Sequence, residues 1–318
     1  MKRVEYYTLL KEQYTDIDTF SDILHTFRRI EQYVEPAENV LVSVSGGSDS
    51  DCIVHILCKY FPEYLYKCFF VFVDTGLEYK ATKQHLKDLE SKYGITIDRI
   101  RGKSVVWAVK EYGIPLLNKC KARKLSQYLK GTPKGEYVIF EKESKIFGFT
   151  EKERELALYC KTNGIRVSEK CCDVSKKKPL HDYAKQNHID LTITGERKAE
   201  GGIRATVYKG CFSERNLKFM PLYWWSNHTK EIFKAIEHIR YSDCYEVYGM
   251  KRTGCCGCPF GRNKHEELMI MKTFEPELFN ACMKVFGEAY RLTDRFHVRK
   301  GQILDEVSDP RPDPEKEG

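Results

Sequence analysis

Hydrophobic positions recur at helical spacing through the first 37 residues of the chain. The apolar positions are Leu9, Leu10, Tyr14, Ile17, Phe20, Ile23, Leu24, Phe27 and Ile30. A repeat of three to four residues places such side chains on one face of an amphipathic helix. The pattern therefore predicts one or two helices that end at Pro36 and form an N-terminal helical segment over residues 1–37.

From residue 38 onward the pattern changes to short apolar runs that alternate with helical stretches. The apolar runs cover residues 40–44, 68–73, 95–100 and 189–195, and a helical pattern over residues 80–93 precedes the third run. Such alternation is typical of parallel strands joined by right-handed crossovers. We therefore expect an α/β fold with a doubly wound, mostly parallel sheet and with ligands at the carboxyl ends of its strands.

The composition divides the rest of the chain into further segments. The α/β domain is expected over residues 38–235, with a lysine-rich, less regular insertion at about residues 118–170. Residues 236–303 form a Cys-rich and helical C-terminal segment. The last residues, 304–318, are acidic and rich in proline, which predicts a disordered tail.

A glycine-rich turn directly follows the first predicted strand and has the sequence Ser45-Gly46-Gly47-Ser48-Asp49-Ser50. Backbone N–H groups at such a turn, together with the dipole of the helix that follows, form an anion site. Because no Gly-Lys-Ser/Thr follows, the turn is not a Walker A loop. A bare Ser-Gly-Gly is a flexible turn in most proteins, whereas the whole hexapeptide between a strand and a helix is much rarer.

This turn resembles the SGGxDS signature of the PP-loop superfamily, which binds the pyrophosphate end of ATP. The resemblance implies that residues Ser45, Gly46, Gly47, Ser48, Asp49 and Ser50 bind ATP and that Mg²⁺ lies near Asp49. Asp74, at the end of the second strand, is expected to hold Mg²⁺ or a ribose hydroxyl; the alternative is that it caps the segment after Thr75. Glu78 and Tyr79 are weaker candidates for the same pocket.

The ends and the apolar runs of the chain indicate its compartment. The chain begins with mixed charged residues rather than an apolar signal core, and its run at residues 68–73 is too short to span a bilayer. We therefore expect a cytoplasmic protein without membrane association. In that compartment the thirteen cysteines favour metal or thiol chemistry over a disulfide framework.

Four cysteines stand out by their spacing: Cys171 and Cys172 are adjacent, and Cys255 and Cys258 form a CxxC turn. A CxxC turn alone could be a zinc knuckle, a redox pair or neither. Two plus two thiolates match the Cys₄ requirement of an iron–sulfur cluster. Cys256, inside the turn, could replace a ligand, carry a labile sulfur or be an exposed bystander. The histidines show no metal-ligand spacing, and we interpret them as structural.

The order of motifs around these cysteines resembles the phosphoadenosine/adenosine phosphosulfate reductase family over roughly residues 38–262. The matching motifs are Cys171-Cys172, Lys177-Lys178-Pro179-Leu180, Thr194-Gly195-Glu196-Arg197, Arg204, Pro221-Leu222, Trp225 and the CxxC. The resemblance implies a [4Fe–4S] cluster on Cys171, Cys172, Cys255 and Cys258, with Zn²⁺ as the alternative. It also implies that the basic segment around Arg197 faces the substrate.

The chain departs from the sulfonucleotide reductases in two ways. It lacks their Glu-Cys-Gly-Leu-His segment, and the single cysteine after Cys258 is Cys282, in a predicted amphipathic helix. It also has the complete phosphate loop, which those reductases tend to lack. Both departures favour relatives that adenylate a substrate and transfer sulfur, such as tRNA-thiolating enzymes and the PP-loop component of DNA phosphorothioation.

The sequence therefore leads to an ATP-pyrophosphatase hypothesis. A substrate oxygen attacks the α-phosphate of ATP, pyrophosphate leaves, and Arg197, Arg204 and Lys178 offset the developing charge. Sulfur delivered on or beside the cluster then displaces AMP. The alternatives are a sulfonucleotide reductase, with Cys256 or Cys282 as nucleophile, and a non-catalytic iron–sulfur nucleotide sensor.

The charge distribution bears on the partners. The net charge is +7, and six Lys and Arg residues fall between residues 118 and 134 without an acid. Such a patch suits a polyanion, and the alternative is a solvated lysine-rich face. The expected partners are an adenine nucleotide, a nucleic acid (DNA or tRNA) and a sulfur donor such as a cysteine desulfurase. The sequence sets neither the acceptor nor the oligomeric state.

Overall fold

The computed structural model describes residues 3–141, 148–201, 208–261, 264–298 and 303, with side chains from residue 7 onward. The chain forms two compact units, each of which is described by itself. The first unit comprises Met1–Val73, Lys80–Ile100 and Leu180–Thr253. The second comprises Asp74–Tyr79, Arg101–Pro179 and Gly254–Gly318. The domain boundaries expected from the sequence remain predictions.

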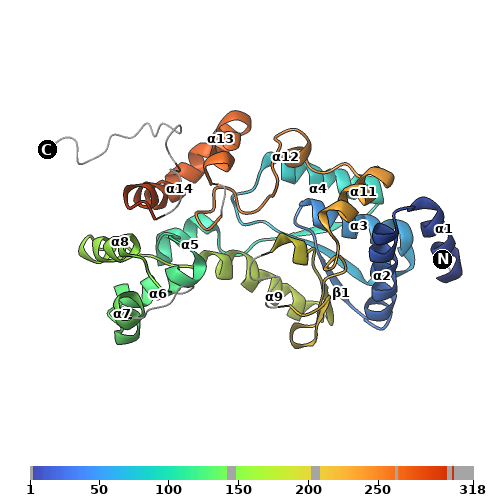
Figure 1. Ribbon diagram of the computed structural model, residues 1–318, viewed down its shortest axis with the longest axis horizontal. Helices are drawn as coiled ribbons and strands as arrows, with labels where there is room; N and C mark the ends of the chain where they lie inside the picture. Colours follow the sequence, from blue (N-terminus) through green and yellow to red (C-terminus); the bar gives the residue numbers. More distant parts are fainter. Residues whose placement is uncertain (1–2, 142–147, 202–207, 262–263, 299–302, 304–318) are drawn as a thin grey trace. The chain divides into compact units, whose positions relative to one another are not determined.

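The first unit contains a six-stranded sheet with the order β3-β2-β1-β4-β6-β5 (Figure 1). The strands are β1 (Val40–Ser43), β2 (Cys68–Val73), β3 (Ile97–Ile100), β4 (Leu191–Ile193), β5 (Phe212–Ser213) and β6 (Lys218–Phe219). All neighbouring strands are parallel except β5 and β6, which are antiparallel. The doubly wound, mostly parallel α/β fold is therefore confirmed.

The strand order reverses at β1. Val40 of β1 is in register with Cys68 of β2 on one side and with Leu191 of β4 on the other. The chain thus builds outward from β1 to β3 and then returns to the opposite side of β1. In such sheets the crevice at the carboxyl ends of the two strands at the reversal receives the ligand. The segments that follow β1 and β4 are therefore the ones that form this crevice.

Two N-terminal helices, α1 (Arg3–Gln13) and α2 (Ile17–Val34), confirm the helical prediction for this part of the chain. Asp16 caps α2 by accepting a hydrogen bond from Thr19 N at 2.9 Å, which satisfies a backbone donor at the helix start. The predicted apolar face is the buried one, since Ile23, Phe27, Ile30 and Val34 are all buried. Burial of this face joins α2 to the core of the sheet.

The other helices of the first unit are α3 (Ser48–Tyr60), α4 (Lys80–Tyr93), most of α9 (Lys178–Gln186), α11 (Asn227–Ile236) and α12 (Asp243–Glu246). The carboxylate of Glu237, just after α11, connects several of these helices. It accepts hydrogen bonds at 2.6–2.8 Å from the side chains of Gln13, Tyr14, His55, Lys59 and Tyr60. Burial raises the pKa of Glu237, but the hydrogen bonds from His55, Lys59 and the two tyrosines lower it more, and the net shift is downward.

The second unit is helical, with α5 (Val105–Tyr112), α6 (Lys119–Leu129), α7 (Pro133–Phe140), α8 (Glu151–Thr162), α13 (Lys264–Phe274) and α14 (Pro276–Arg295). The expectation of a less regular insertion at residues 118–170 is wrong for its described part, because α6, α7 and α8 lie there. Each of these helices has a capping residue, Asn118, Thr132 or Thr150, whose side chain accepts a hydrogen bond from the first turn. Lysine is a good helix former, so the high lysine content was a poor sign of irregularity.

None of the described helices has the length and hydropathy that crossing a bilayer requires.

Candidate functional site

The glycine-rich turn lies between β1 and α3, as the sequence predicts. Gly46 has φ +66°, in the left-handed region that favours glycine. A Cβ atom at this position would lie 2.7 Å from Cγ2 of Thr82 on α4, so the close approach also requires a glycine. Gly47 is the N-cap residue of α3 and has no side chain to cover the helix start. A larger residue at position 47 would therefore place a side chain over the start of α3, where a glycine places none.

The serine hydroxyls divide into two groups. The Ser50 hydroxyl holds the turn itself: it donates to Gly47 O at 2.7 Å and accepts from Gly47 N at 3.2 Å and from Ser45 N at 3.3 Å. The Ser48 hydroxyl instead accepts a hydrogen bond from Nζ of Lys230 at 3.1 Å. Ser50 thus stabilises the turn, whereas Ser48 belongs to a polar cluster at its mouth.

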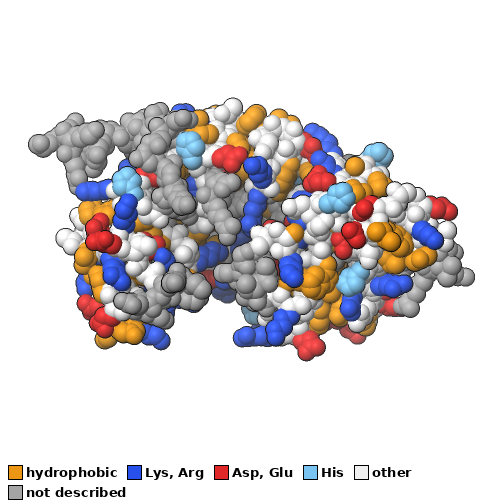
Figure 2. Space-filling model, in the orientation of Figure 1, with side chains coloured by type: hydrophobic (Ala, Val, Ile, Leu, Met, Phe, Trp, Pro, Cys, Tyr) orange, Lys and Arg blue, Asp and Glu red, His pale blue; other side chains and the backbone are white. Residues whose placement is uncertain are grey.

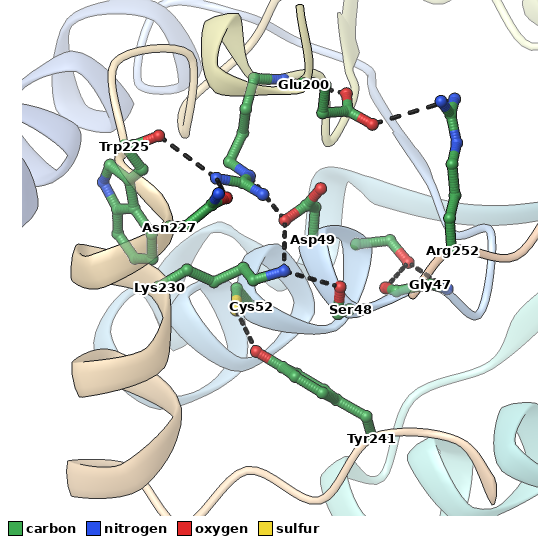
Figure 3. Close-up of polar contacts among 12 residues, drawn as sticks. Gly47, Ser48, Asp49, Cys52, Glu200, Trp225, Asn227, Lys230, Tyr241 and Arg252 are labelled. Atoms are coloured by element: carbon green, nitrogen blue, oxygen red, sulfur yellow. Dashed lines mark hydrogen bonds and ion pairs between the residues drawn. The ribbon is translucent and has the colours of Figure 1, made fainter. Parts of the chain in front are cut away.

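The carboxylate of Asp49 is the centre of that cluster. Its Oδ1 accepts a hydrogen bond from Nε of Arg197 at 2.8 Å and lies 3.6 Å from Nζ of Lys230. Figure 3 shows Lys230 extending from α11 toward both Asp49 and Ser48. Two cations from different elements therefore meet one carboxylate at the start of α3.

Arg197 reaches Asp49 from the segment that follows β4. Its Nη1 donates to Trp225 O and Ser226 O, both at 3.3 Å, and to Oδ1 of Asn227 at 3.1 Å. The residue is only 4% exposed. The guanidinium is thus fixed by acceptors on two sides, and it holds the segments after β1 and β4 together.

Hydroxyl groups from the end of the first unit also line the turn. The Tyr245 hydroxyl lies 2.9 Å from that of Thr253 and accepts a hydrogen bond from Thr253 N at 3.2 Å. A Cβ atom on Gly47 would meet these two hydroxyls at 3.2 and 3.4 Å. Sequence reasoning missed Lys230, Tyr245 and Thr253, because no local pattern marks a residue that arrives at a site only through tertiary packing.

The remaining candidates for the nucleotide site are not among the described residues of the first unit. Asp74 and Lys178 belong to the second unit, and Arg204 lies outside the described residues. The Asp74 carboxylate accepts a hydrogen bond from Gly76 N at 2.8 Å and pairs with Arg101. The alternative expected from the sequence, a helix N-cap, is not formed: Asp74 accepts within a turn at Gly76, and the next described helix, α4, begins at Lys80. The binding roles of Asp74, Lys178 and Arg204 remain predictions.

The weaker candidates Glu78 and Tyr79 also lie in the second unit. Glu78 accepts hydrogen bonds from Thr75 N at 3.3 Å and from the Thr75 hydroxyl at 2.6 Å. Burial raises the pKa of the Glu78 carboxyl above its usual value. The Tyr79 hydroxyl donates to Glu267 at 3.4 Å.

The four spaced cysteines all belong to the second unit. Cys171 and Cys172 immediately precede a π-helical turn at Asp173–Lys177. Cys255 and Cys258 form a tight turn, in which Cys258 N donates to Cys255 O at 3.2 Å. The thiols interact: hydrogen bonding between Cys171 and Cys172 raises the pKa of Cys171 and lowers that of Cys172.

Two lysines of the second unit are close to these thiols. Lys119 and Lys176 both favour the thiolate of Cys172 and so contribute to its lowered pKa. Lys176 also lowers the pKa of Cys255, although burial of that thiol raises it more. Cationic neighbours of this kind stabilise thiolates, which are the form of cysteine that binds metals.

The second unit shapes the CxxC turn through two residues of its last helices. Gly257 has φ +61°, its N–H donates to Oε1 of Glu267 on α13 at 3.1 Å, and its carbonyl accepts from the Tyr290 hydroxyl of α14. A Cβ atom on Gly257 would come within 2.8 Å of that hydroxyl and 3.0 Å of Cβ of Cys282. The turn therefore requires glycine. Sequence reasoning had no signal for Glu267 or Tyr290.

Cys256 and Cys282 are both completely buried, at 0% exposure. The Cys282 thiol donates to Cys256 O at 3.5 Å, and burial raises the pKa of Cys282 to about 12. The interpretation of Cys256 as an exposed bystander is therefore wrong. Neither thiol is accessible to a substrate, as nucleophilic attack requires.

The thirteen cysteines all lie in the described residues, and none forms a disulfide. Within the described residues, no three His, Cys, Asp or Glu side chains are arranged as ligands of a single metal ion. A structural zinc site needs four such ligands at one tetrahedral point. The [4Fe–4S] cluster and its zinc alternative therefore both remain predictions.

Acids neutralise part of the basic segment between residues 118 and 134, contrary to expectation. Nζ of Lys121 lies 2.5 Å from Glu153, and Nε of Arg123 lies 3.1 Å from Glu169. These ion pairs could not be predicted from the sequence, because each acid is more than thirty residues from its basic partner in the chain. On the face shown in Figure 2, Lys and Arg side chains are interspersed with Asp and Glu side chains rather than gathered in one patch.

Comparison with protein-family models gives one clear match. The model of the phosphoadenosine phosphosulfate reductase domain matches residues 39–140 and 138–260, which is more than half of the chain. The matched region contains both the glycine-rich turn and the four spaced cysteines.

Two curated proteins of Methanocaldococcus jannaschii are similar in sequence, and both are described as uncharacterized. MJ0066 is 27% identical over 277 residues, which cover 85% of this chain and 46% of that protein. MJ0973 is 24% identical over 263 residues, which cover 80% of this chain and 50% of that protein. The chain thus spans about half the length of these relatives.

Solved structures with partial similarity share 12–14% identity with the chain. A phosphoadenylyl-sulfate reductase from Candida auris aligns over 73% of this chain and 88% of its own, with a TM-score of 0.44. The NH₃-dependent NAD synthetase from Campylobacter jejuni covers 91% of this chain and 100% of its own (TM-score 0.37). The tRNA thiolase NcsA from Methanococcus maripaludis, solved with its [4Fe–4S] cluster, covers 91% and 84% (TM-score 0.37).

Proposed function

The chain belongs to the phosphoadenosine phosphosulfate reductase domain family, and we propose that within this family it is an ATP pyrophosphatase that adenylates a substrate for sulfur transfer. The segment Ser45–Ser50 would bind the β- and γ-phosphates of ATP, with Mg²⁺ beside them. Cys171, Cys172, Cys255 and Cys258 would hold a [4Fe–4S] cluster. Because the chain spans about half of its curated relatives, this proposal concerns the chemistry of this region alone.

One observation carries the proposal: a complete SGGxDS turn lies at the carboxyl end of β1, next to the point where the strand order reverses. Gly46 and Gly47 place no side chain over the start of α3, and an anion is stabilised at such a helix start by N–H groups and the helix dipole. Arg197 and Lys230 add two positive charges at the same point. A triphosphate chain offers the negative charge that such a turn accommodates.

The buried cysteines favour adenylation over sulfonucleotide reduction. A reductase of this family type would need a thiol that attacks the sulfur of the substrate. Cys256 and Cys282, the candidates that the sequence offered, are both 0% exposed. The raised pKa of Cys282, about 12, keeps its thiol protonated at neutral pH. These properties suit residues that support the CxxC turn.

The four spaced cysteines suit an iron–sulfur cluster in number, burial and charge. Cys171 is buried, and the other three are partly buried. Lys119 and Lys176 would offset the negative charge of four thiolates. A cluster bound by these residues would supply a site for the sulfur that is transferred.

The chemistry that this chain's residues support has two redox-neutral steps. In the first, a substrate hydroxyl or carbonyl oxygen attacks the α-phosphate of ATP, and pyrophosphate leaves. In the second, sulfide replaces the adenylated oxygen, and AMP leaves. The amides of the turn and the cations Arg197 and Lys230 would stabilise the charge that develops on the phosphates. Arg204 and Lys178 are proposed for the same role.

A nucleic acid, either tRNA or DNA, is the proposed acceptor. The proposed source of sulfur is a cysteine desulfurase together with a thiol reductant, which releases the persulfide sulfur of the desulfurase as sulfide and is itself oxidised to a disulfide. Support for the nucleic acid comes from the net charge of +7 and from exposed Lys130 and Lys134 in the second unit. A polyanion is attracted to such residues even though Lys121 and Arg123 are paired with acids.

The test of this function is release of pyrophosphate from ATP. Protein purified without oxygen is incubated with Mg²⁺, ATP and either bulk tRNA or DNA, and pyrophosphate is measured with an enzyme-coupled assay. Release that depends on the nucleic acid supports the proposal. ATP binding without release in the presence of either acceptor would favour the nucleotide sensor. Sulfite release from a sulfonucleotide and reduced thioredoxin would instead identify a reductase.

A further inference from the structure

We propose that Lys230 is a pyrophosphate-binding residue, and that phosphate oxygens of ATP replace Asp49 as the partner of its ammonium group. This inference rests on the proposed function and adds to it the residue that contacts the leaving group. Lys230 lies on α11, far from the glycine-rich turn in sequence. Its Nζ is nevertheless 3.1 Å from the Ser48 hydroxyl at the start of α3.

Positive charge exceeds negative charge at the start of α3. Arg197 and Lys230 bring two positive charges to Oδ1 of Asp49, which supplies one negative charge. The amino end of α3 adds about half a positive charge through its dipole. The sum is positive, and the two cations are only 5% and 14% exposed, so water screens them poorly. An anion bound at this point would correct the imbalance.

The other acidic groups near the turn do not cancel this charge. Glu200 lies 3.9 Å from Arg252, so that pair is approximately neutral. Asp51, in the first turn of α3, lies 2.7 Å from Nε2 of His85 and is 1% exposed. Burial raises the pKa of the Asp51 carboxyl, and the hydrogen bond with His85 opposes that shift. The excess of positive charge thus remains at Asp49.

The two cations differ in how firmly they are held. Arg197 makes hydrogen bonds to two carbonyl oxygens and an amide oxygen besides Asp49, which fix its plane. Lys230 makes a hydrogen bond to Ser48 and a longer contact of 3.6 Å to Asp49. A lysine has a flexible stem and three donors that can be redirected. Lys230 is therefore the cation that can turn from Asp49 to a phosphate.

The location of Lys230 on its helix also supports a role in phosphate binding. Ser226 caps α11, and Lys230 lies close to that end, where the helix dipole disfavours a cation. Figure 3 shows the side chain leaving α11 and ending at Ser48 and Asp49. There it pairs with Asp49, donates to Ser48 and lies 6.0 Å from the centre of the Tyr241 ring. From this position its ammonium group can also bind phosphates held at the start of α3.

The test is the affinity for inorganic pyrophosphate and for AMP, measured by isothermal titration calorimetry. We expect Lys230→Met to weaken pyrophosphate binding by about tenfold to a hundredfold, which is the usual effect of losing a hydrogen bond to a charged group. AMP affinity should change by less than about threefold, because AMP lacks the β- and γ-phosphates. Lys230→Arg should restore most of the pyrophosphate affinity.

The matched control is Lys234→Met, which removes the same charge one turn further along α11. Lys234 pairs with Glu246 at 2.8 Å and does not contact the turn in the contacts described for it. It should bind pyrophosphate as the unmodified protein does. Circular dichroism checks the fold of each variant, and Lys230→Gln, which keeps a donor for Ser48, replaces Lys230→Met if that variant does not fold.

Failure of the inference and failure of the proposed function give different results. If the unmodified protein prefers pyrophosphate to AMP and the Lys230 variants bind it equally well, the inference is overturned and the proposed function stands. If the unmodified protein shows no preference for pyrophosphate over AMP, the proposed function itself fails.

Discussion

Gly195 and Asp49 are so close that a Cβ atom on Gly195 would lie 3.1 Å from the carbonyl carbon of Asp49. The same atom would lie 3.1 Å from Ser50 N. The segment after β4 therefore packs directly against the backbone at the start of α3. A glycine at position 195 is what allows Arg197, two residues later, to reach the Asp49 carboxylate.

Replacing this glycine should weaken nucleotide binding. In Gly195→Ala the added methyl group presses on the backbone of Asp49 and Ser50, which we expect to lower the free energy of unfolding by about 1–3 kcal/mol and to weaken ATP binding. Gly210→Ala is the control, because a Cβ atom there meets nothing within 4 Å. Thermal unfolding and ATP titration provide the measurements. Equal behaviour of the two variants would show that the close approach has no role in shaping the turn.

The second prediction concerns the cysteines of the second unit. Protein purified without oxygen should be brown and contain about four irons and four acid-labile sulfides, as a [4Fe–4S] cluster requires. Replacing Cys171 or Cys258 with serine should remove most of the iron, because a thiolate ligand is lost. Cys282→Ser should keep the iron, since Cys282 is buried behind the turn and hydrogen-bonds to Cys256 O. One zinc ion and no labile sulfide would contradict the cluster.

The third prediction uses the buried carboxylate of Glu237. Its pKa is lower in the folded than in the unfolded chain, so its ionised form stabilises the fold above the unfolded value of about 4.5, and this stabilisation is lost as the pH falls below it. We expect Glu237→Gln to lose roughly 3–5 kcal/mol at pH 7, because five donors would lose a charged acceptor.

The measurement is thermal unfolding of both proteins between pH 7 and pH 3. The difference between them should stay constant down to about pH 5 and shrink as the pH falls further toward 3. Glu246→Gln, which removes a partly exposed pair with Lys234, is the control and should cost no more than about 1 kcal/mol. A difference for Glu237→Gln that stays constant with pH would contradict the assignment of a lowered pKa.

The fourth prediction concerns nucleic acid. Lys121 and Arg123 form ion pairs with Glu153 and Glu169, so reversing their charges would also disturb the helices. The exposed residues Lys130 and Lys134 are better probes. Lys130→Glu together with Lys134→Glu should weaken binding of tRNA or DNA. It should also reduce the dependence of binding on salt, because each phosphate contact that is lost lowers the number of counterions released on binding.

Binding is measured by fluorescence anisotropy over a range of salt concentrations, and ATP affinity is the internal control. ATP affinity should not change, because the two sites use separate residues and no described contact of the glycine-rich turn involves Lys130 or Lys134. Absence of binding to either nucleic acid at low salt in the unmodified protein would mean that the acceptor is a small molecule.

Strands and helices with strong local patterns could be predicted from the sequence. The apolar run at residues 68–73 coincides with β2, and the predicted helix at residues 80–93 coincides with α4. β5 and β6 were missed because each contains two residues, which is too short for a pattern. The three helices in the lysine-rich insertion were also missed. Their starts are marked by capping residues, whereas lysine content does not distinguish helix from irregular structure.

The candidate site was only partly predictable for a related reason. The glycine-rich turn and the segment around Arg197 carry local motifs, and the structure brings them together at Asp49. No local motif marks Lys230. It reaches Ser48 only because α11 packs in the same unit as the glycine-rich turn. The buried state of Cys256 likewise depends on α14, which follows it in the chain. Contacts between distant segments are set by packing, which a single sequence does not display.

The central claim is that the Ser45–Ser50 segment binds the pyrophosphate end of ATP. The most direct measurement is a comparison of the affinities for Mg²⁺·ATP and AMP in the unmodified protein and in Gly47→Val, whose side chain would meet the hydroxyls of Tyr245 and Thr253. We predict that ATP binds at least about tenfold more tightly than AMP, which corresponds to about 1.4 kcal/mol, and that Gly47→Val abolishes ATP binding. Equal affinities for ATP and AMP in the unmodified protein would contradict the claim.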